Sequence, residues 1–297
     1  MHVGGNIAQA RFVDACAKFN RTEILSYSER IEGYRYLNDL LLHPSAEEQP
    51  IFVIHWGPDV QMLIKQLEGQ DVVYTAHSAG WRITIPRHVP IICVSRNTLG
   101  YWGRYAPNSL IRYVPNVVSL NEPCGDYKSI RDIDVLVQRR KSSKYLLHEL
   151  LPMLKNRCNT VLLEDWVDDL HGYFRRSKVY LYDSVEHWAA KGVTEGFGLP
   201  PLEAIACGCC VFSSINDALA DFLDPGVNCH KICTYTIEYD VQQILRALSR
   251  PMIPPVDCKL LSPYSITKVT ARLLNAFTEI EEFFAFARNP KTKIAQP

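Results

Sequence analysis

The sequence lacks an excess of charge of either sign. Its 297 residues include 32 Lys and Arg against 32 Asp and Glu, so the formal net charge is zero. Without a global positive field, binding to nucleic acid is not expected, and any anion site must be local. A run of eighteen apolar residues is also missing, and early charges at Arg11, Asp14 and Lys18 are unlike a secretory signal. We therefore expect a cytoplasmic protein.

Metal-ligand patterns are missing as well. The ten cysteines do not form two pairs at metal-ligand intervals. Cys207, Cys209 and Cys210 are expected to be small buried residues between a helix and a strand, which fits a reducing compartment. Asp132 and Asp134 have the spacing of a metal motif, but they stand at a strand start, the wrong end for a ligand. We predict no metal site and no cofactor.

Short apolar runs alternate with helical patterns along the whole chain. This alternation is typical of parallel sheets covered by helices, and the composition, 47% hydrophobic and 22% charged, is that of a globular protein. We predict an α/β protein with Rossmann-like domains at residues 1–120 and 128–265 and a closing helix and tail at 266–297. The irregular stretch from Asn116 to Arg131 is the expected linker.

The expected strands of the first domain are Thr22–Ser26, Ile51–His55, Val72–Thr75, Pro90–Ser95 and Ile111–Val114. Those of the second domain are Ile133–Gln138, Thr160–Glu164, Val179–Tyr182, Cys210–Ser213 and Cys229–Ile232. Helices are expected at Ser143–Lys155, Val167–Arg176, Pro200–Cys207, Tyr239–Leu248 and Ile266–Phe286. Because parallel strands bind ligands at their carboxyl ends, the site is expected in a cleft between the two domains.

The most informative stretch is EGFGLPPLEAIACGCCVFSS, at residues 195–214. Its first two glycines, Gly196 and Gly198, let the backbone approach a ligand closely. Pro200 and Pro201 then open a short helix, because proline is favoured in a first helical turn. The free N–H groups and the positive end of such a helix attract phosphate. The stretch therefore predicts a site for a ligand that carries phosphate.

Two carboxylates flank this turn. Glu203 lies about one helical turn inside and would repel a phosphate, so a diol such as a ribose is its better partner. Glu195 can likewise accept hydrogen bonds from a sugar. The alternatives are that Glu203 merely caps its helix and that Glu195 is a solvated loop acid.

The stretch resembles the signature of retaining GT-B glycosyltransferases of the family-four type, in which two glutamates eight apart sit in an EGFGLPPLEAMACGCPV-like run. Cys210 departs from the usual proline, which alters backbone stiffness more than chemistry. The resemblance implies two Rossmann-like domains facing across a cleft. It also implies sugar transfer with retention, without a metal, from a nucleoside diphosphate sugar to a saccharide, lipid or small-molecule acceptor.

Residue roles follow from the resemblance. Glu203 would hold the ribose, and Glu195 with the backbone after it would hold the donor sugar. That backbone comprises Gly196, Phe197, Gly198 and Leu199. A nucleotide-sugar epimerase or hydrolase of the same fold and a non-catalytic sugar-nucleotide-binding subunit are the alternatives.

A basic turn, QRRKSSK, follows the first strand of the second domain. Two cations there can neutralise a departing diphosphate. Arg139 and Lys144 keep the five-residue spacing of the family's arginine and lysine, but the flanking glycines are missing. Arg140 or Lys141 can therefore share this role. The alternative is a solvated basic surface.

Other candidates stand at further strand ends. His77 matches a family histidine that faces the transferred sugar, the alternative being an ordinary hydrogen-bonded histidine, and His55 is a weaker candidate. Trp166 and Val167 stand where the family holds the nucleotide base, although Trp166 could instead fill the surface between the domains. Ser184 precedes Glu195 by eleven residues, a longer path than PSxxEGFG, and it is assigned to the donor.

The amino-terminal region departs from the expected pattern. Gly4 and Gly5, followed by a helical pattern, resemble the family's first strand-to-helix turn, in which Gly5 would approach the phosphates. No strand precedes them, and losing a central strand would open a hole in the sheet. We therefore expect either a missing upstream piece or a replacement for that strand.

A segment of mixed aromatic and basic side chains suggests peripheral contact with a membrane surface. An amphipathic helix packed on a sheet is the alternative. The residues concerned are Tyr101, Trp102, Arg104, Tyr105 and Arg112.

Overall fold

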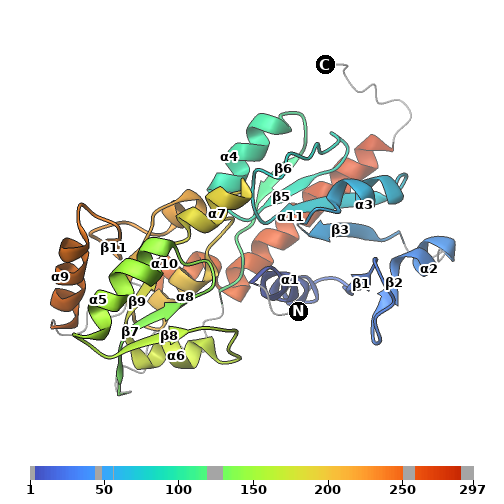
Figure 1. The fold of residues 1–297 in the computed structure, drawn as a ribbon. Helices are drawn as coiled ribbons and strands as arrows, with labels where there is room; N and C mark the ends of the chain where they lie inside the picture. Colours follow the sequence, from blue (N-terminus) through green and yellow to red (C-terminus); the bar gives the residue numbers. More distant parts are fainter. Residues whose placement is uncertain (1–3, 44–48, 56, 119–129, 250–257, 289–297) are drawn as a thin grey trace.

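A computed structural model describes residues 4–43, 49–55, 57–118, 130–249 and 258–288. Two α/β domains lie side by side in Figure 1, the first from blue to cyan and the second from green to orange. The red carboxyl-terminal helix runs back along the first domain. Most of the expected linker lies outside the described residues, although Val117, Val118 and Arg131 at its ends are buried.

The first domain is built on a parallel sheet with the strand order β3-β4-β5-β6. Its elements are α1 (Gly4–Cys16), β1 (Leu25–Ser26), β2 (Arg35–Tyr36), α2 (Leu37–Leu42), β3 (Ile51–His55), α3 (Val60–Gln66), β4 (Asp71–Ala76), β5 (Ile91–Cys93), α4 (Arg96–Tyr105) and β6 (Ile111–Tyr113). Four of the five strands expected from the sequence form this sheet. They are contiguous, so no hole opens between them.

The expected strand at Thr22–Ser26 is wrong in extent and in place. Only Leu25 and Ser26 are extended, and they pair with β2 in a separate two-stranded ribbon. Polar neighbours account for this, because Glu23 and Arg35 form an exposed ion pair and leave too short an apolar run for a core strand. Gly5 is also placed differently, since it lies in the first turn of α1 rather than in a turn after a strand.

The second domain contains a parallel sheet with the order β11-β10-β9-β7-β8. Its elements, with the closing segment, are β7 (Ile133–Gln138), the π-helix η1 (Tyr145–Leu150), α5 (Leu151–Lys155), β8 (Thr160–Leu163), α6 (Leu170–Arg176), β9 (Ser177–Tyr182), α7 (Val185–Lys191), α8 (Leu199–Ala206), β10 (Cys210–Ser213), the 3-10 helix η2 (Asp217–Asp221), β11 (His230–Lys231), α9 (Ile237–Leu248), α10 (Cys258–Leu261), η3 (Ser262–Tyr264) and α11 (Ile266–Ala287). All five expected strands are present within a few residues.

The long closing helix α11 packs on the first domain. Its buried residues Leu273 and Ile280 share an apolar cluster with Val73 and Ile92 of the β4-β5 pair. The helix near the end of the sequence therefore completes the core of the first domain. This packing places the closing helix along the first domain (Figure 1).

A second apolar cluster crosses from one domain to the other. Ala8 of α1 and Val94 after β5 belong to the same buried group as Phe197, Leu199 and Leu202. The surface over the EGFG motif is therefore covered by the first domain. A cavity of about 350 Å³ lies elsewhere, beside β2 and α2, and none of its lining residues belongs to the motif.

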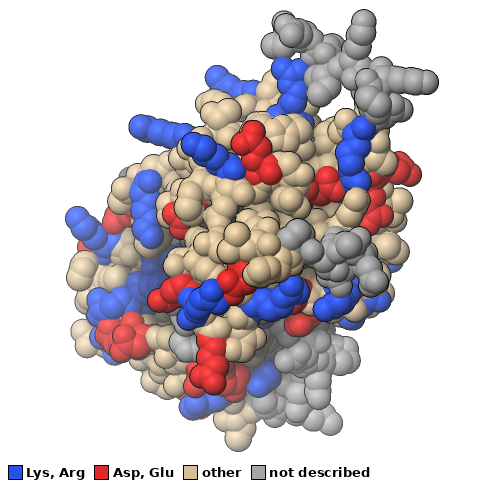
Figure 2. All heavy atoms as spheres, turned by 90° about the vertical axis from the view of Figure 1, so that its right-hand side faces the viewer, with Lys and Arg blue, Asp and Glu red and all other residues tan. Residues whose placement is uncertain are grey.

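Charge is mixed on the face shown in Figure 2. Lysine and arginine side chains alternate there with aspartate and glutamate, in keeping with the balanced composition. Of the helices that the structure describes, none combines the length and the apolar character needed to span a bilayer.

Candidate functional site

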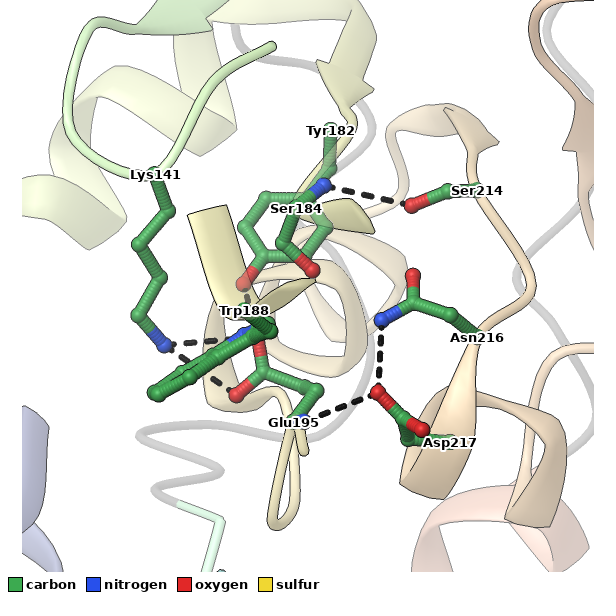
Figure 3. Close-up of polar contacts among 8 residues, drawn as sticks. All are labelled: Lys141, Tyr182, Ser184, Trp188, Glu195, Ser214, Asn216 and Asp217. Atoms are coloured by element: carbon green, nitrogen blue, oxygen red, sulfur yellow. Dashed lines mark hydrogen bonds and ion pairs between the residues drawn. The ribbon is translucent and has the colours of Figure 1, made fainter. Parts of the chain in front are cut away.

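Glu195 is the centre of a buried polar network (Figure 3). Glu195 is only 3% exposed. Lys141 Nζ lies 3.1 and 3.3 Å from the two carboxylate oxygens, the Tyr182 hydroxyl donates to Oε2 at 2.5 Å, and Trp188 Nε1 donates to the same oxygen at 2.8 Å. The carboxylate is therefore held by three donors and is not a solvated loop acid.

The sheet brings these donors together. Tyr182 is the last residue of β9, which pairs with β7 in parallel, so the turn after β7 reaches the same edge. Lys141 in that turn has the left-handed φ of 68°, which is uncommon for a residue with a side chain. Its ammonium group lies 4.4 Å from the centre of the Trp188 ring, a cation–π distance. The left-handed backbone of Lys141 thus directs its side chain towards Glu195.

The network keeps Glu195 ionised. Burial by itself would raise the pKa of this carboxyl group, but the charge of Lys141 and the hydrogen bonds from Tyr182 and Trp188 outweigh burial and leave the pKa below its ordinary value. Burial and the charge of Glu195 raise the pKa of Tyr182 well above its ordinary value, so this phenol remains a donor. The ionised carboxylate of Glu195 therefore lies beside the amino group of Lys141, whose pKa is lowered by burial although the charge of Glu195 opposes this shift.

The backbone of Glu195 is fixed from the other side. Its N–H donates to Asp217 Oδ2 at 3.0 Å, and Asn216 Nδ2 donates to the same oxygen at 3.0 Å. Two buried oxygens next to this network, Ser184 Oγ and Asn216 Oδ1, make no hydrogen bond of ordinary geometry with the described residues. Figure 3 shows both side chains near Glu195. Buried oxygens without partners are expected where a polar ligand binds.

The two glycines of the motif are required by close contacts. A Cβ on Gly196 would stand 1.4 Å from the carbonyl oxygen of His77, in the first domain. Gly198 has the left-handed φ of 83° at the start of α8, where a Cβ would meet Leu219 at 2.3 Å. In this structure the close neighbour of Gly196 is the first domain, and the approach of these glycines to a ligand stays a prediction.

Hydrogen bonds join the domains beside this contact. Ala79 N donates to Thr194 Oγ1 at 3.1 Å, and Thr194 N donates to Ala79 O at 3.0 Å. Asn97 Nδ2 also donates to Thr194 Oγ1, at 2.9 Å. The residue before Glu195 thus connects the motif directly to the loop after β4 and to the first turn of α4.

His77 lies at the predicted strand end, next to His55. The ring nitrogens His55 Nδ1 and His77 Nε2 are 3.0 Å apart, so one ring donates to the other. Burial lowers the pKa of His77 to about 4 and that of His55 well below 6.5. The pair is therefore neutral near pH 7, and the backbone of His77, at its carbonyl, contacts Gly196.

Glu203 has a partner that the sequence did not suggest. Its Oε1 accepts a hydrogen bond from Arg11 Nη1, in α1, at 2.8 Å. His171 Nε2 lies 3.8 Å from the same oxygen. Glu203 does not fold back to cap α8, because its carboxylate meets the first domain. Neither the period of α1 nor the motif contains a signal for this pair.

The structure brings Lys141 to Glu195 but not Arg139 or Lys144. Arg139 forms an exposed ion pair with Glu164. Lys144 has an exposed side chain at the start of η1, where its backbone N–H donates to Glu186 at 3.0 Å. Sequence spacing pointed to the turn, and Lys141 was among its possible contributors. The left-handed backbone at Lys141, which the spacing does not reveal, places this residue and not its neighbours beside Glu195.

The remaining predicted donor residues are spread over the second domain. Trp166 is 42% exposed and donates to Asp168 at 3.3 Å, and Val167 is half-buried. Phe197 and Leu199 are buried. Ser184 precedes α7, a helix that is not among those expected from the sequence, and Trp188 of that helix is not among the assigned site residues.

Asp132 and Asp134 lie where the sequence places them, at the amino end of β7. They form ion pairs with Arg176 and Lys178, respectively. Both carboxylates therefore pair with neighbouring cations. They lie at the opposite end of β7 from Lys141.

Solved structures of similar fold are GT-B proteins. Sucrose-phosphate synthase from Thermosynechococcus elongatus superposes with a TM-score of 0.64 at 13% identity and covers 94% of both chains. A glycosyltransferase from Rickettsia africae gives 0.61 at 12% identity, over 95% of this chain and 96% of its own. HepE from Anabaena, solved with UDP, gives 0.56 at 11% identity, over 77% and 79%. The protein therefore has the GT-B fold, with two Rossmann-like domains.

The sequence itself matches a family over the second domain. Residues 140–252 match the family described as glycosyl transferases group 1, and this range includes Lys141, Glu195 and Glu203. The matched part of the chain is therefore similar to group 1 glycosyltransferases, and the resemblance predicted from the motif is confirmed. A comparison with curated proteins found no match.

Proposed function

We propose that the protein is a retaining glycosyltransferase that moves a sugar from a nucleoside diphosphate donor to a saccharide, lipid or small-molecule acceptor without a metal. The observation that carries this proposal is the buried Lys141–Glu195 pair at the carboxyl ends of β7 and β9. Glu195 of this pair stands just before α8 in the sequence, and the amino end of α8 can hold phosphate.

Local positive charge supports a diphosphate at this edge of the sheet. The charges of Arg140 and Lys191 act on Lys141, so three cations share one region of a protein with no net charge. Such a group can neutralise the diphosphate as it departs, which is the role a metal has in other transferases. The solved UDP complex of HepE, which has the same fold, agrees with a nucleotide donor.

Separate groups suit the sugar and the nucleoside. Asn216 Oδ1, which has no hydrogen-bond partner among the described residues, and Ser184 Oγ, which lies beside the Tyr182 hydroxyl, are suited to donor hydroxyls. The backbone from Gly196 to Leu199 would follow the sugar and phosphates, and Glu203 would bind the ribose. Trp166, exposed after β8, offers an aromatic face to a base.

The proposed chemistry occurs on one face of the sugar. The bond from the anomeric carbon to the phosphate oxygen breaks, the acceptor oxygen attacks from the same side, and its proton passes to the departing phosphate. Glu195 does not act as the nucleophile, because three donors occupy its carboxylate. It instead orients Lys141 towards the diphosphate.

A thermal-shift screen of nucleotide sugars tests the donor site, because a ligand that binds the folded protein raises its melting temperature. We expect one class of donor to stabilise the wild type and to lose this effect in Glu203→Ala. Glu164→Ala, at an exposed glutamate of the same domain, is the matched control. A shift that survives in Glu203→Ala would contradict the assigned ribose site.

Product analysis then tests the reaction. We expect NMR to show a transferred sugar of unchanged anomeric configuration, formed equally well with a chelator. Lys141→Met should lower turnover more than Arg139→Met, which removes only an exposed ion pair. Free sugar without transfer would indicate a hydrolase, and a rearranged nucleotide sugar an epimerase. Donor binding without either product would indicate a non-catalytic subunit.

The proposal includes a cytoplasmic location with contact to a membrane surface. Eight cysteines are free thiols, which suits a reducing compartment. On α4, Tyr105 is 58% exposed, with the Arg104 guanidinium 5.5 Å from its ring centre, whereas Trp102 is buried against Tyr74. Co-sedimentation of wild type and Tyr105→Ser with anionic vesicles tests this contact, and equal recovery of both in the pellet would contradict it.

A further inference from the structure

The carboxylate assigned to the ribose is covered by a helix of the other domain. Arg11 Nη1 lies 2.8 Å from Glu203 Oε1, and the same nitrogen donates to the carbonyl oxygen of Val117 at 3.0 Å. The side chain of Arg11 is 18% exposed and that of Glu203 is 7% exposed. Arg11 is thus anchored within the first domain while it binds the second.

The surroundings of this ion pair leave little access to Glu203. Ala8, one turn before Arg11, packs with Leu199 and Leu202 on the turns of α8 beside Glu203. On the α6 side, His171 Nε2 lies 3.8 Å from Glu203 Oε1 and is buried without a hydrogen-bond partner among the described residues. A ribose hydroxyl can therefore reach Glu203 only when α1 moves away from α8.

We infer that Arg11 gates the nucleotide site: in the ligand-free protein it occupies Glu203, and the donor ribose must displace it. This inference rests on the proposed function, because it takes Glu203 as the ribose-binding residue. Opening of the α1–α8 contact and nucleotide binding are then one coupled event. A ligand that binds the open form better shifts the protein towards that form.

Charge explains why this contact can act as a gate. A buried carboxylate that loses its cationic partner is strongly destabilised, so Glu203 remains with Arg11 until another partner replaces it. Ribose hydroxyls can satisfy the carboxylate by hydrogen bonds, whereas water entering a closed apolar interface cannot do so without separating the domains. Arg11→Gln weakens the closed form and leaves Glu203 intact for the ribose.

Calorimetric titration with UDP, GDP and ADP tests the inference in the full chain. We expect the nucleoside diphosphate that binds the wild type to bind Arg11→Gln more tightly, by about fivefold, which corresponds to about 1 kcal/mol. Lys18→Gln, an exposed cation just after α1, is the matched control and should bind as the wild type does. Hydrogen exchange without nucleotide should be faster in α1 and α8 of Arg11→Gln alone.

The outcomes separate this inference from the proposed function. Equal or weaker nucleotide binding by Arg11→Gln, with the wild type binding normally, would overturn the gate and leave the function standing. Binding of none of the three nucleotides by either protein would overturn both. Binding by Arg11→Gln only would support both. Arg11→Lys, which keeps the charge, should restore slow exchange if the variant is folded and the ion pair is responsible.

Discussion

At the scale of single residues, two neutral histidines lie half-buried at neighbouring strand ends. His55 and His77 exchange a hydrogen bond of 3.0 Å, and Phe12 of α1 packs edge-on against the His55 ring. The unfolded chain takes up protons on both rings near pH 6.5, but burial keeps His77 neutral down to about pH 4 and lowers the pKa of His55 as well. The folded protein therefore loses stability as the pH falls between these values.

We predict a steep acid limb in the stability of the wild type. Between about pH 6.5 and pH 4, each buried histidine lowers the free energy of unfolding by up to about 1.4 kcal/mol per pH unit. The double variant His55→Gln, His77→Gln should show a shallower slope in urea titrations over this range. His88→Gln, at an exposed histidine, should keep the slope of the wild type. An equal slope in all three proteins would contradict neutral burial of the pair.

At this scale the sequence predicted the two site carboxylates, Glu195 and Glu203, better than the cations that pair with them. Glu195 and Glu203 are found where the motif places them, because the glycines and prolines around them fix the local backbone. Lys141 and Arg11 could not be chosen from spacing. Lys141 depends on one left-handed residue in its turn, and Arg11 lies 192 positions from Glu203.

At the scale of elements, α7 is the feature that departs furthest from the sequence prediction. Seven residues, Val185–Lys191, form a helix between Ser184 and the motif. The helix ends at Gly192, whose φ of 65° turns the chain back, and it carries Trp188 over Lys141 and Glu195. A segment so short has too few apolar repeats to be recognised as a helix.

We predict that Trp188→Phe destabilises the protein although an aromatic ring is kept. The variant loses the N–H that donates to the buried carboxylate of Glu195, and such a loss costs about 1–3 kcal/mol. The pKa of Glu195 should rise, since Trp188 is one of the groups that lower it. Chemical denaturation at pH 7 measures the loss. Trp166→Phe, at an exposed tryptophan, serves as control, and an equal loss in both would contradict the role of this hydrogen bond.

The π-helix η1 shows a second limit of prediction at this scale. The pattern Ser143–Lys155 is helical as expected, but its first part winds more loosely before Pro152 enters the first turn of α5. Proline lacks the N–H that a regular α-helix would use there. The spacing of apolar residues indicates a helix but does not distinguish a π-helix from an α-helix.

At the scale of the whole molecule, backbone atoms of the two domains meet closely beside the Glu195 motif. Gly196 lies against the carbonyl of His77, and Gly80 lies so close to Gly192 that a Cβ would stand 2.6 Å from the Gly192 oxygen. Both contacts flank the bonds between Thr194 and Ala79. Closure of the domains therefore positions the residues on either side of Glu195.

We predict that Gly196→Ala prevents this closure. The added Cβ would meet only backbone atoms, which cannot move aside as a side chain can. Overpacking of this kind costs about 1–3 kcal/mol, and small-angle scattering should show a larger radius of gyration. Gly100→Ala, in α4 with open space around it, should be slightly stabilising. Unchanged dimensions and stability in Gly196→Ala would contradict the contact.

The sequence alone determined the alternation of strands and helices, the second-domain sheet, and the motif with its two carboxylates. These features are local, because periodicity, glycine and proline act over a few neighbouring residues. The tertiary structure decided which groups those carboxylates meet: Lys141, Tyr182 and Trp188 for Glu195, and Arg11 for Glu203. Such partners depend on strand order and domain contact, which no local pattern records.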